Sequence, residues 1–346
     1  MDLRLNRFRI AGIEMIRRIP EISYDTREVC VLLENQEDND PQGSILFMTG
    51  TVFSFLFPNS ILDPSKPDES FEGEYKMCRR WWPCMLLDQD ALDDGRIKLR
   101  GATKGLAVYR GWMLKPELYG KLYDMLRKQG IILINTPEEY KRCHLFPNWY
   151  EDFRDLTPYS RWTDSRDLNE AVSLLDSFNG AVIVKDWVKS RKHEWYEACF
   201  IRDAHERKAA IGVIRRFIER QGSDMIGGVV LREYLPLKAI GWHKRSGMPL
   251  SEEYRAFFLC GRLIALTPYW EGEKGNLTDK EREKIEALGN RAKSNFFTMD
   301  VARTVGGHII VMELGDGQVS GLQQLNTEIF YRRIAGIITC DDNTRE

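Results

Sequence analysis

The stretch FFTMDVARTVGGHIIVMELGDGQVSGL, residues 296–322, predicts two antiparallel strands joined at its Gly-Gly pair. Such a pair suits a two-residue hairpin turn, which needs positive φ angles. Pairing outward from this turn places Val305 opposite His308 and, further out, Asp300 opposite Glu313. Cross-strand partners point to the same face of a sheet, with their Cβ atoms roughly 5 Å apart. The stretch therefore predicts two carboxylates side by side on one face.

Paired carboxylates at this spacing repel each other unless one is protonated or a cation bridges them. A hard divalent cation with oxygen ligands, Mg²⁺ above all, removes the repulsion and commonly also holds substrate phosphates. Asp316, just beyond the second strand, could supply a third oxygen ligand. The alternative is a slipped register, or a carboxylate pair at a solvated end of the sheet. We predict a magnesium site at Asp300 and Glu313.

A lysine at the end of an apolar strand is the second informative feature. Lys185 ends the strand predicted over residues 181–185 and opens the basic run KDWVKSRK, which also contains Lys189 and Lys192. A lysine at the end of a buried strand can contact a phosphate in a part of a site that excludes water. The alternative is a solvated loop, for which a basic run is also typical. A covalent nucleotidyl-lysine is disfavoured, because Asp186 follows at once and no glycine comes after it.

Two further strands carry charged residues. Glu233 ends an apolar strand and is followed by the backbone of Tyr234 and Leu235. A carboxylate with free backbone groups can recognise the edge of an adenine, and the alternative is a surface glutamate. Arg255 lies inside the apolar stretch EYRAFFLC, where a guanidinium is costly unless it is paired. Its partner is either a phosphate or a carboxylate of the same chain.

The predicted elements change character along the chain. The first part predicts a parallel α/β unit, from strands over 53–57, 106–109 and 131–134 and a helix over 116–130. After residue 158 the pattern is α+β with antiparallel pairs, including a hairpin with its turn at Gly261-Arg262. The uncharged stretch 44–57 is too short to span a bilayer and predicts two buried strands.

Composition and charge exclude several classes of protein. The chain has 346 residues, 43% of them hydrophobic, which excludes a disordered or collagen-like chain and suggests two or three domains. Fifty basic and 52 acidic residues leave a net charge of −2, so we expect no nucleic-acid partner and no membrane association. Seven scattered cysteines without a CxxC pair predict reduced thiols and a cytoplasmic location. The P-loop, GxSxG and HExxH patterns are absent from the sequence.

Taken together, these residues resemble the ATP-grasp superfamily, and most closely its clade named for an arginine and two lysines. The strand lysine, the strand-end glutamate, the strand arginine and the paired acids occur in the order typical of that superfamily. The matching segments cover roughly residues 53–322. They are YRGWMLKPELY, LINTPEEYKRCHLFP, VIVKDWVKSRKHEW, VLREYLPL, RSGMPLSEEYRAFFL and the stretch FFTMDVARTVGGHIIVMELGDGQVSGL quoted above.

The resemblance implies an α/β plus α+β architecture, the ATP-grasp fold. A Rossmann-like pre-ATP-grasp domain over 53–145 would precede an ATP-grasp domain over 146–322, whose two lobes clamp MgATP about a hinge near 233–236. Residues 1–52 would be an N-terminal extension and residues 323–346 a C-terminal tail, both outside the resemblance.

The resemblance also implies a function. An ADP-forming carboxylate–amine ligase transfers the γ-phosphate of ATP to a carboxylate, and an amine then attacks the acyl phosphate to give an amide; amino acids, peptides and proteins are the candidate substrates. Carried onto this sequence, the family's roles fall on three sets of residues. They are catalytic Arg255 and Lys189; nucleotide-binding Lys185, Glu233, Tyr234, Leu235, Arg142 and Lys192; and magnesium-binding Asp300, Glu313 and Asp316.

One position departs from the family pattern. Most ATP-grasp enzymes end in Glu-x-Asn, whereas Gly315 stands at the asparagine position here, with Asp316 next to it. Either Asp316 substitutes, or a second metal is bound differently. The clade also resembles the cell division cycle protein 123 type, which binds ATP yet serves the assembly of a translation initiation factor. An ATP-binding assembly module with a protein partner and no turnover is therefore the alternative, and an RNA-modifying enzyme using the basic segment 186–207 is a third.

Overall fold

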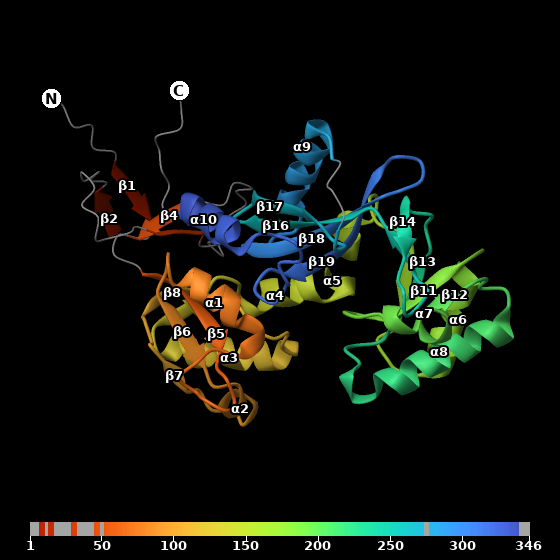
Figure 1. Ribbon diagram of the computed structural model, residues 1–346, viewed down its shortest axis with the longest axis horizontal. Coiled ribbons are helices and arrows are strands. Elements are labelled where there is room, and N and C mark those ends of the chain that lie inside the picture. Colours follow the sequence, from red (N-terminus) through yellow and green to blue (C-terminus); the bar gives the residue numbers. More distant parts are fainter. Residues whose placement is uncertain are drawn as a thin grey trace.

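The computed structural model describes residues 7–10, 13–16, 29–32, 45–48, 52–272 and 277–338. Within them, three larger sheets follow one another along the chain and lie side by side in Figure 1. Smaller two-stranded sheets pair β1 (Arg7–Ile10) with β2 (Ile13–Ile16), and β3 (Val29–Leu32) with β4 (Ile45–Met48). The two strands predicted within 44–57 are thus present as β4 and β5.

The first larger sheet has the strand order β7-β6-β5-β8-β9. Its strands β5 (Phe53–Pro58), β6 (Cys84–Leu87), β8 (Gly105–Tyr109) and β9 (Ile131–Leu133) run parallel, and β7 (Leu99–Arg100) is antiparallel at one edge. Its helices are α1 (Glu72–Cys78), α2 (Gln89–Asp93), α3 (Pro116–Lys128) and α4 (Pro137–His144). The predicted parallel α/β unit is confirmed, and a capping box between Thr136 and Glu139 begins α4.

The second sheet is antiparallel, with the order β10-β13-β11-β12. It consists of β10 (Ser160–Trp162), β11 (Val182–Asp186), β12 (Phe200–Ile201) and β13 (Val229–Glu233), accompanied by α5 (Phe146–Tyr150), α6 (Leu168–Ser173), α7 (Trp195–Ala198) and α8 (Arg207–Gln221). Val182 and Val184 pack in one core with Ile214 and Phe217 of α8. Because side chains alternate along a strand, Ile183 and Lys185 point to the opposite face, away from that core.

The third sheet has the order β17-β16-β18-β19 and is also antiparallel. Its strands are β16 (Glu253–Leu259), β17 (Arg262–Pro268), β18 (Phe296–Arg303) and β19 (Ile309–Asp316); a hairpin of β14 (Ala239–Trp242) and β15 (Pro249–Ser251) precedes them, and α9 (Asp279–Leu288) and α10 (Thr327–Ile338) complete the unit. Tyr254, Phe258 and Met299 pack in a core with the aromatic residues of α5. Arg255 and Asp300 alternate with them and occupy the other face.

Two hairpin turns differ from the sequence prediction. The β16–β17 turn is made by Cys260 and Gly261, both with positive φ angles of 49° and 74°, and Arg262 already pairs with Leu259. The predicted turn at Gly261-Arg262 was one residue late, because a cysteine gives no local signal for positive φ.

The β18–β19 turn also differs, yet the predicted pairing of Asp300 with Glu313 is confirmed. The predicted Val305–His308 pair is wrong, since the Thr304 N–H donates to the His308 carbonyl at 2.9 Å. A β-bulge between Asp300 and Val301 then shifts the register by one residue. The two departures cancel, so the carboxylates stand opposite each other as expected.

A network of buried polar groups joins the first unit to the end of the chain. The Arg110 guanidinium, at the end of β8, is 2% exposed and donates to both Glu74 carboxylate oxygens, at 2.6 and 3.2 Å, and to the Gly317 and Ser320 carbonyls. The Tyr331 hydroxyl of α10 donates to Glu74 at 2.7 Å. The segment that follows β19 is therefore fixed to the first sheet.

Asp316 belongs to the same junction. Its carboxylate is fully buried and accepts hydrogen bonds from Asn135 Nδ2 at 2.6 Å and from the Gln318 backbone N–H at 2.9 Å. Burial raises the pKa of Asp316 to about 7, and the hydrogen bonds only partly oppose this effect.

We predict that Glu74→Ala lowers the free energy of unfolding by about 3–5 kcal/mol, because it leaves the buried Arg110 charge without its carboxylate. Chemical denaturation measures the change. Glu72→Ala is the matched control: it removes an exposed helix pair with Lys76 and should leave stability nearly unchanged. Equal losses in the two variants would contradict the role given to Arg110.

We predict that part of the pH dependence of stability comes from Asp316. Its folded pKa lies above the ordinary unfolded value of about 4, so this group favours folding most below pH 4 and loses that contribution as pH rises to about 7. Asp316→Asn should flatten this fall between pH 4 and 7 in denaturation series. Asp124→Asn, on the exposed side of α3, should leave the slope unchanged.

Candidate functional site

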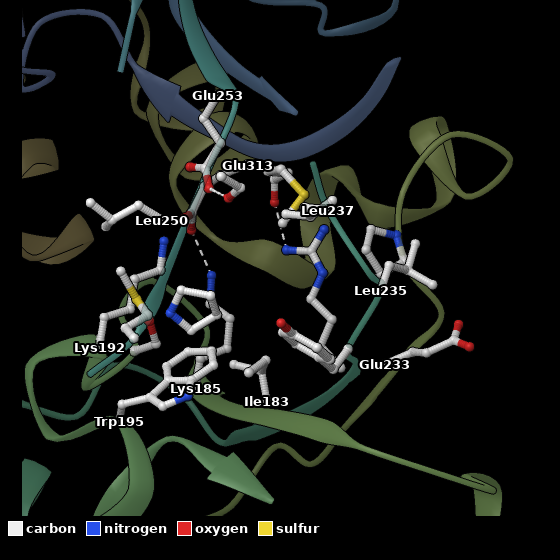
Figure 2. A pocket seen from close by; sticks show the side chains of 18 of the residues that line it. Ile183, Lys185, Lys192, Trp195, Glu233, Leu235, Leu237, Leu250, Glu253 and Glu313 are labelled. Carbon is white, nitrogen blue, oxygen red and sulfur yellow. Dashed lines mark hydrogen bonds and ion pairs between the residues drawn. The ribbon is translucent and has the colours of Figure 1, made fainter. Parts of the chain in front are cut away.

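A cavity of about 870 Å³, partly open to solvent, lies between the second and third sheets (Figure 2). Its walls come from β11, β13, the segment that follows β13, the β14–β15 hairpin, the start of β16 and β19. One part of the wall is apolar and includes Trp195, Met248 and Leu250. The lining also includes the charged side chains of Lys185 and Glu313.

Lys185 reaches the cavity from the second sheet, and its side chain is 5% exposed. Its Nζ donates to Glu313 Oε1 at 2.6 Å, across the space between the sheets, and lies 5.4 Å from the centre of the Phe146 ring. A carboxylate and an aromatic face thus stabilise the ammonium together. Burial opposes the charge of Glu313, but the surrounding cations, Lys185 first, outweigh it and lower the pKa of that carboxyl.

Asp300 is held by a cation of its own. The Arg255 Nε and Nη2 atoms each lie 2.8 Å from one of its carboxylate oxygens. Burial opposes the Arg255 charge, yet Asp300 outweighs this and raises the pKa of the guanidinium. Of the two partners expected for Arg255, the structure shows the carboxylate of the same chain. The repulsion expected between Asp300 and Glu313 is therefore relieved by two separate ion pairs.

The segment after β13 forms one end of the cavity. Tyr234 packs against Phe200, with ring centres 5.1 Å apart, and against Trp195 at 6.1 Å, so that these rings form an aromatic wall. Leu235 also lines the cavity. The exposed Glu233 carboxylate extends away from the cavity in Figure 2, and only its backbone lies beside it. The adenine-binding role predicted for Glu233 stays a prediction.

Lys192 and Glu253 both line the cavity (Figure 2). The walls disfavour the Lys192 charge, but Glu253, Tyr269 and Glu313 outweigh this effect and raise the pKa of the ammonium. Burial raises the pKa of Glu253, which also accepts a hydrogen bond from the Ser251 hydroxyl. Sequence reasoning missed Glu253. The sequence feature that could have identified it is its position two residues before Arg255, which places both on the same face of the strand.

Arg232 is a second residue that sequence reasoning missed. It is 6% exposed on β13, lines the cavity, and its guanidinium lies 5.6 Å from the centre of the Phe146 ring. Burial lowers its pKa to about 10. The sequence feature that could have identified Arg232 is the one that identified Arg255, because both arginines interrupt an otherwise apolar strand.

Five predicted site residues do not line the cavity. Arg255 and Asp300 form their ion pair on the same sheet face as Glu313. The other three, Arg142, Lys189 and Asp316, lie further away in the fold. Arg142, on α4, pairs with Asp152 at 2.9 Å and does not line the cavity. Lys189 is exposed on the loop after β11 and is also absent from the lining. Asp316 is buried at the junction with the first unit, because β19 continues past Leu314 and strand alternation turns it away from Glu313.

The described residues contain no group of three or more His, Cys, Asp and Glu side chains placed to hold a metal. A cation would find two carboxylates on one face, Asp300 and Glu313, in neighbouring strands. Such oxygen donors fit Mg²⁺, which usually keeps several water ligands and takes only one or two carboxylates from a protein. The donor set therefore suits a magnesium ion bound together with a phosphate-bearing ligand.

No helix among the described residues has the length and apolar character needed to cross a membrane. Among the described residues, the thiols of Cys78, Cys84, Cys143 and Cys199 form no disulfide, and the side chains of Cys30 and Cys340 lie outside the described part of the chain.

Comparison with solved structures shows the fold. A RimK domain ATP-grasp protein from Sphaerobacter thermophilus superposes with a TM-score of 0.56 at 13% identity, over 82% of this chain and 98% of that one. The ATP-grasp ligase PsnB, complexed with a precursor peptide and AMPPNP, gives 0.52 at 14% identity, over 82% and 97%. The macrocyclase MdnC from Microcystis aeruginosa, bound with a precursor peptide, gives 0.51 at 11% identity, over 83% and 100%.

Comparison by sequence gives a narrower result. No curated protein matches the chain. Residues 171–334 match the family model for the ATP-grasp domain, family 3 of the clade named for an arginine and two lysines. This segment contains Lys185, Arg255, Asp300 and Glu313. The chain therefore has the ATP-grasp fold, and its residues 171–334 are similar to that clade of the ATP-grasp superfamily.

Proposed function

We propose that the protein is an ADP-forming ligase that joins a carboxylate to an amine, using ATP and Mg²⁺. The observation that carries the proposal is the cavity between the second and third sheets, where Lys185 and Glu313 meet within an ATP-grasp fold. PsnB, with the same fold, has been solved with AMPPNP and with Mg and ADP.

The two parts of the cavity suit the two parts of a nucleotide. We assign the base to the apolar part, against Trp195 and Tyr234 and beside the backbone of residues 233–235. The triphosphate then lies at the charged part, within reach of Lys185 and Lys192. In this arrangement Glu233 contributes its backbone and not its carboxylate.

The ion pairs of the site have a direct bearing on binding. Bound Mg²⁺ supplies charge neutralisation for the phosphates of ATP. Glu313 and Asp300 would hold the metal, and they pair with Lys185 and Arg255 in the structure. These two cations would then be available to donate to phosphate oxygens, because they lie beside the metal ligands. Arg255 would act on the transferred phosphoryl group in this way, whereas we assign no role to Arg142 or Lys189.

The proposed reaction has two steps. A substrate carboxylate oxygen attacks the γ-phosphorus, the bond to the β-phosphate oxygen breaks, and ADP leaves. An amine then attacks the acyl carbon, phosphate leaves, and the amine loses a proton to give the amide. Two proteins with the same fold, PsnB and MdnC, have been solved with precursor peptides, which supports a peptide or protein as substrate here.

One observation favours the alternative of an ATP-binding assembly module. Gly315 occupies the position where most ATP-grasp enzymes have asparagine, and Asp316 is turned toward Asn135. No oxygen donor of a side chain therefore follows Glu313 at the usual place. This alternative predicts nucleotide binding without turnover.

We expect Mg²⁺ to strengthen ATP binding to the wild-type protein, and the double substitution Asp300→Asn/Glu313→Gln to abolish that increment by removing both anionic ligands. Calorimetric titration with and without Mg²⁺ measures it. Glu283→Gln, on the exposed side of α9, is the control and should bind as wild type does. A Mg²⁺ increment that survives in the double variant would refute the metal assignment.

We expect ADP release to depend on an added carboxylate substrate, tested over a panel of amino acids and peptides. Hydroxylamine should trap the acyl phosphate as a hydroxamate, detected by mass spectrometry. Lys185→Met should reduce ADP release by roughly 10²-fold or more, as expected when a charged group that stabilises the transition state is lost. ATP binding with background ADP release across the panel would favour the assembly module.

A further inference from the structure

The β-bulge in β19 decides which face of the third sheet Glu313 occupies. Between the turn and the bulge, Val301 pairs with Val311; beyond it, Asp300 pairs with Glu313, so Met312 is the extra residue. If the register of the turn continued unbroken, Met312 would stand opposite Asp300. Glu313 would then point to the apolar face, because a shift of one residue exchanges the two faces of a strand. The bulge therefore aims this carboxylate at the cavity.

The backbone of the bulge is held by the second sheet. Arg232 Nη1 donates to the Met312 carbonyl at 2.5 Å, and Nη2 donates to the Val311 carbonyl at 3.3 Å. Nη2 also donates to the Thr157 hydroxyl at 2.6 Å, and this hydroxyl donates to the Val311 carbonyl at 2.8 Å. The Val311 N–H in turn donates to the Leu156 carbonyl at 2.8 Å. Arg232 and Thr157 thus satisfy the Met312 and Val311 carbonyls of β19, which is an edge strand of the third sheet.

We propose that Arg232 is a positioning residue for the metal site: it fixes the β19 bulge and thereby directs Glu313 toward Asp300. The proposal rests on the proposed function through the metal role of Glu313. Arg232 also stands directly before residues 233–235, which we assign to the base. A single buried side chain thus connects the backbone beside the base with the strand that carries a metal ligand.

A different role for Arg232 is direct contact with the nucleotide, because its guanidinium also lines the cavity. Thr157 separates the two roles. Thr157→Val removes a hydrogen bond to the bulge and leaves the arginine and its charge in place. If Arg232 acts through the bulge, Thr157→Val should change hydrogen exchange and Mg²⁺-dependent ATP affinity in the same direction as loss of the arginine does.

The experiment compares Arg232→Met, Arg232→Lys, Thr157→Val and Thr157→Ser. Arg161→Met is the control, since it changes an exposed arginine of the neighbouring strand β10 that donates to Tyr159 and not to β19. Hydrogen exchange of peptides spanning 309–316 is measured without ligand. ATP affinity is measured with and without Mg²⁺.

We expect faster exchange over 309–316 in Arg232→Met and Thr157→Val, and a Mg²⁺-dependent gain in ATP affinity that is smaller by roughly 10-fold to 100-fold, as for other groups that orient a metal ligand. Metal-free ATP affinity should not change. Thr157→Ser should restore both properties, and Arg232→Lys should restore them in part, because lysine keeps the charge but lacks the planar pair of donors.

Two results would overturn the inference. Equal losses of ATP affinity with and without Mg²⁺ in Arg232→Met, with Thr157→Val behaving as wild type, would assign Arg232 to the nucleotide itself. Unchanged exchange over 309–316 in both variants would show that the bulge does not depend on them. If wild type gains no affinity from Mg²⁺, the proposed function fails instead, and the exchange measurement still decides whether Arg232 holds the bulge.

Discussion

The contact between Lys185 and Glu313 is the interaction on which the site depends. It joins β11 of the second sheet to β19 of the third, with a separation of 2.6 Å across the cavity. Its formation requires that alternation along β11 turn Val182 and Val184 into one core and Lys185 out of it. It also requires the bulge in β19. The contact between Lys185 and Glu313 therefore depends on the geometry of both sheets.

Two close ion pairs hold the charges of the site: Glu313 with Lys185, and Asp300 with Arg255. Lys185, Asp300 and Arg255 are largely buried, so leaving any of them without its partner would be costly. A bound polyphosphate and its metal carry charges of both signs, so they can replace the partners within each ion pair. The protein is thus stable without ligand while holding the groups that a ligand needs.

Sequence reasoning found the parts of the site that local patterns determine. Lys185, Arg255, Asp300 and Glu313 were recognisable from strands that are otherwise apolar. The pairing of Asp300 with Glu313 was predicted correctly, although the turn and the bulge each depart from the assumed register and only their sum agrees. A local pattern fixes neither, because both depend on backbone contacts with residues far along the chain.

The other differences between the predicted and the observed site also arise from contacts between distant parts of the chain. Asp316 was expected near Glu313, but β19 is longer than predicted, and alternation turns that carboxylate toward Asn135 of the first unit. Arg232 and Glu253 were missed because their faces are known only once distant strands have paired, β13 with β11 and β16 with β18. Sequence spacing describes one strand well, but a site between two sheets requires their relative placement.

The junction at Arg110 has a consequence for how the chain folds. Its partners Gly317 and Ser320 lie 207 and 210 residues further along, and Tyr331 reaches Glu74 over 257 residues. Phe330, Ile334 and Ile338 of α10 share one core with Phe53, Phe55 and Phe57 of β5. Contacts between such distant segments form late, because closing long loops costs entropy before any contact compensates for it. During synthesis, β5 therefore completes its core only after α10 has left the ribosome.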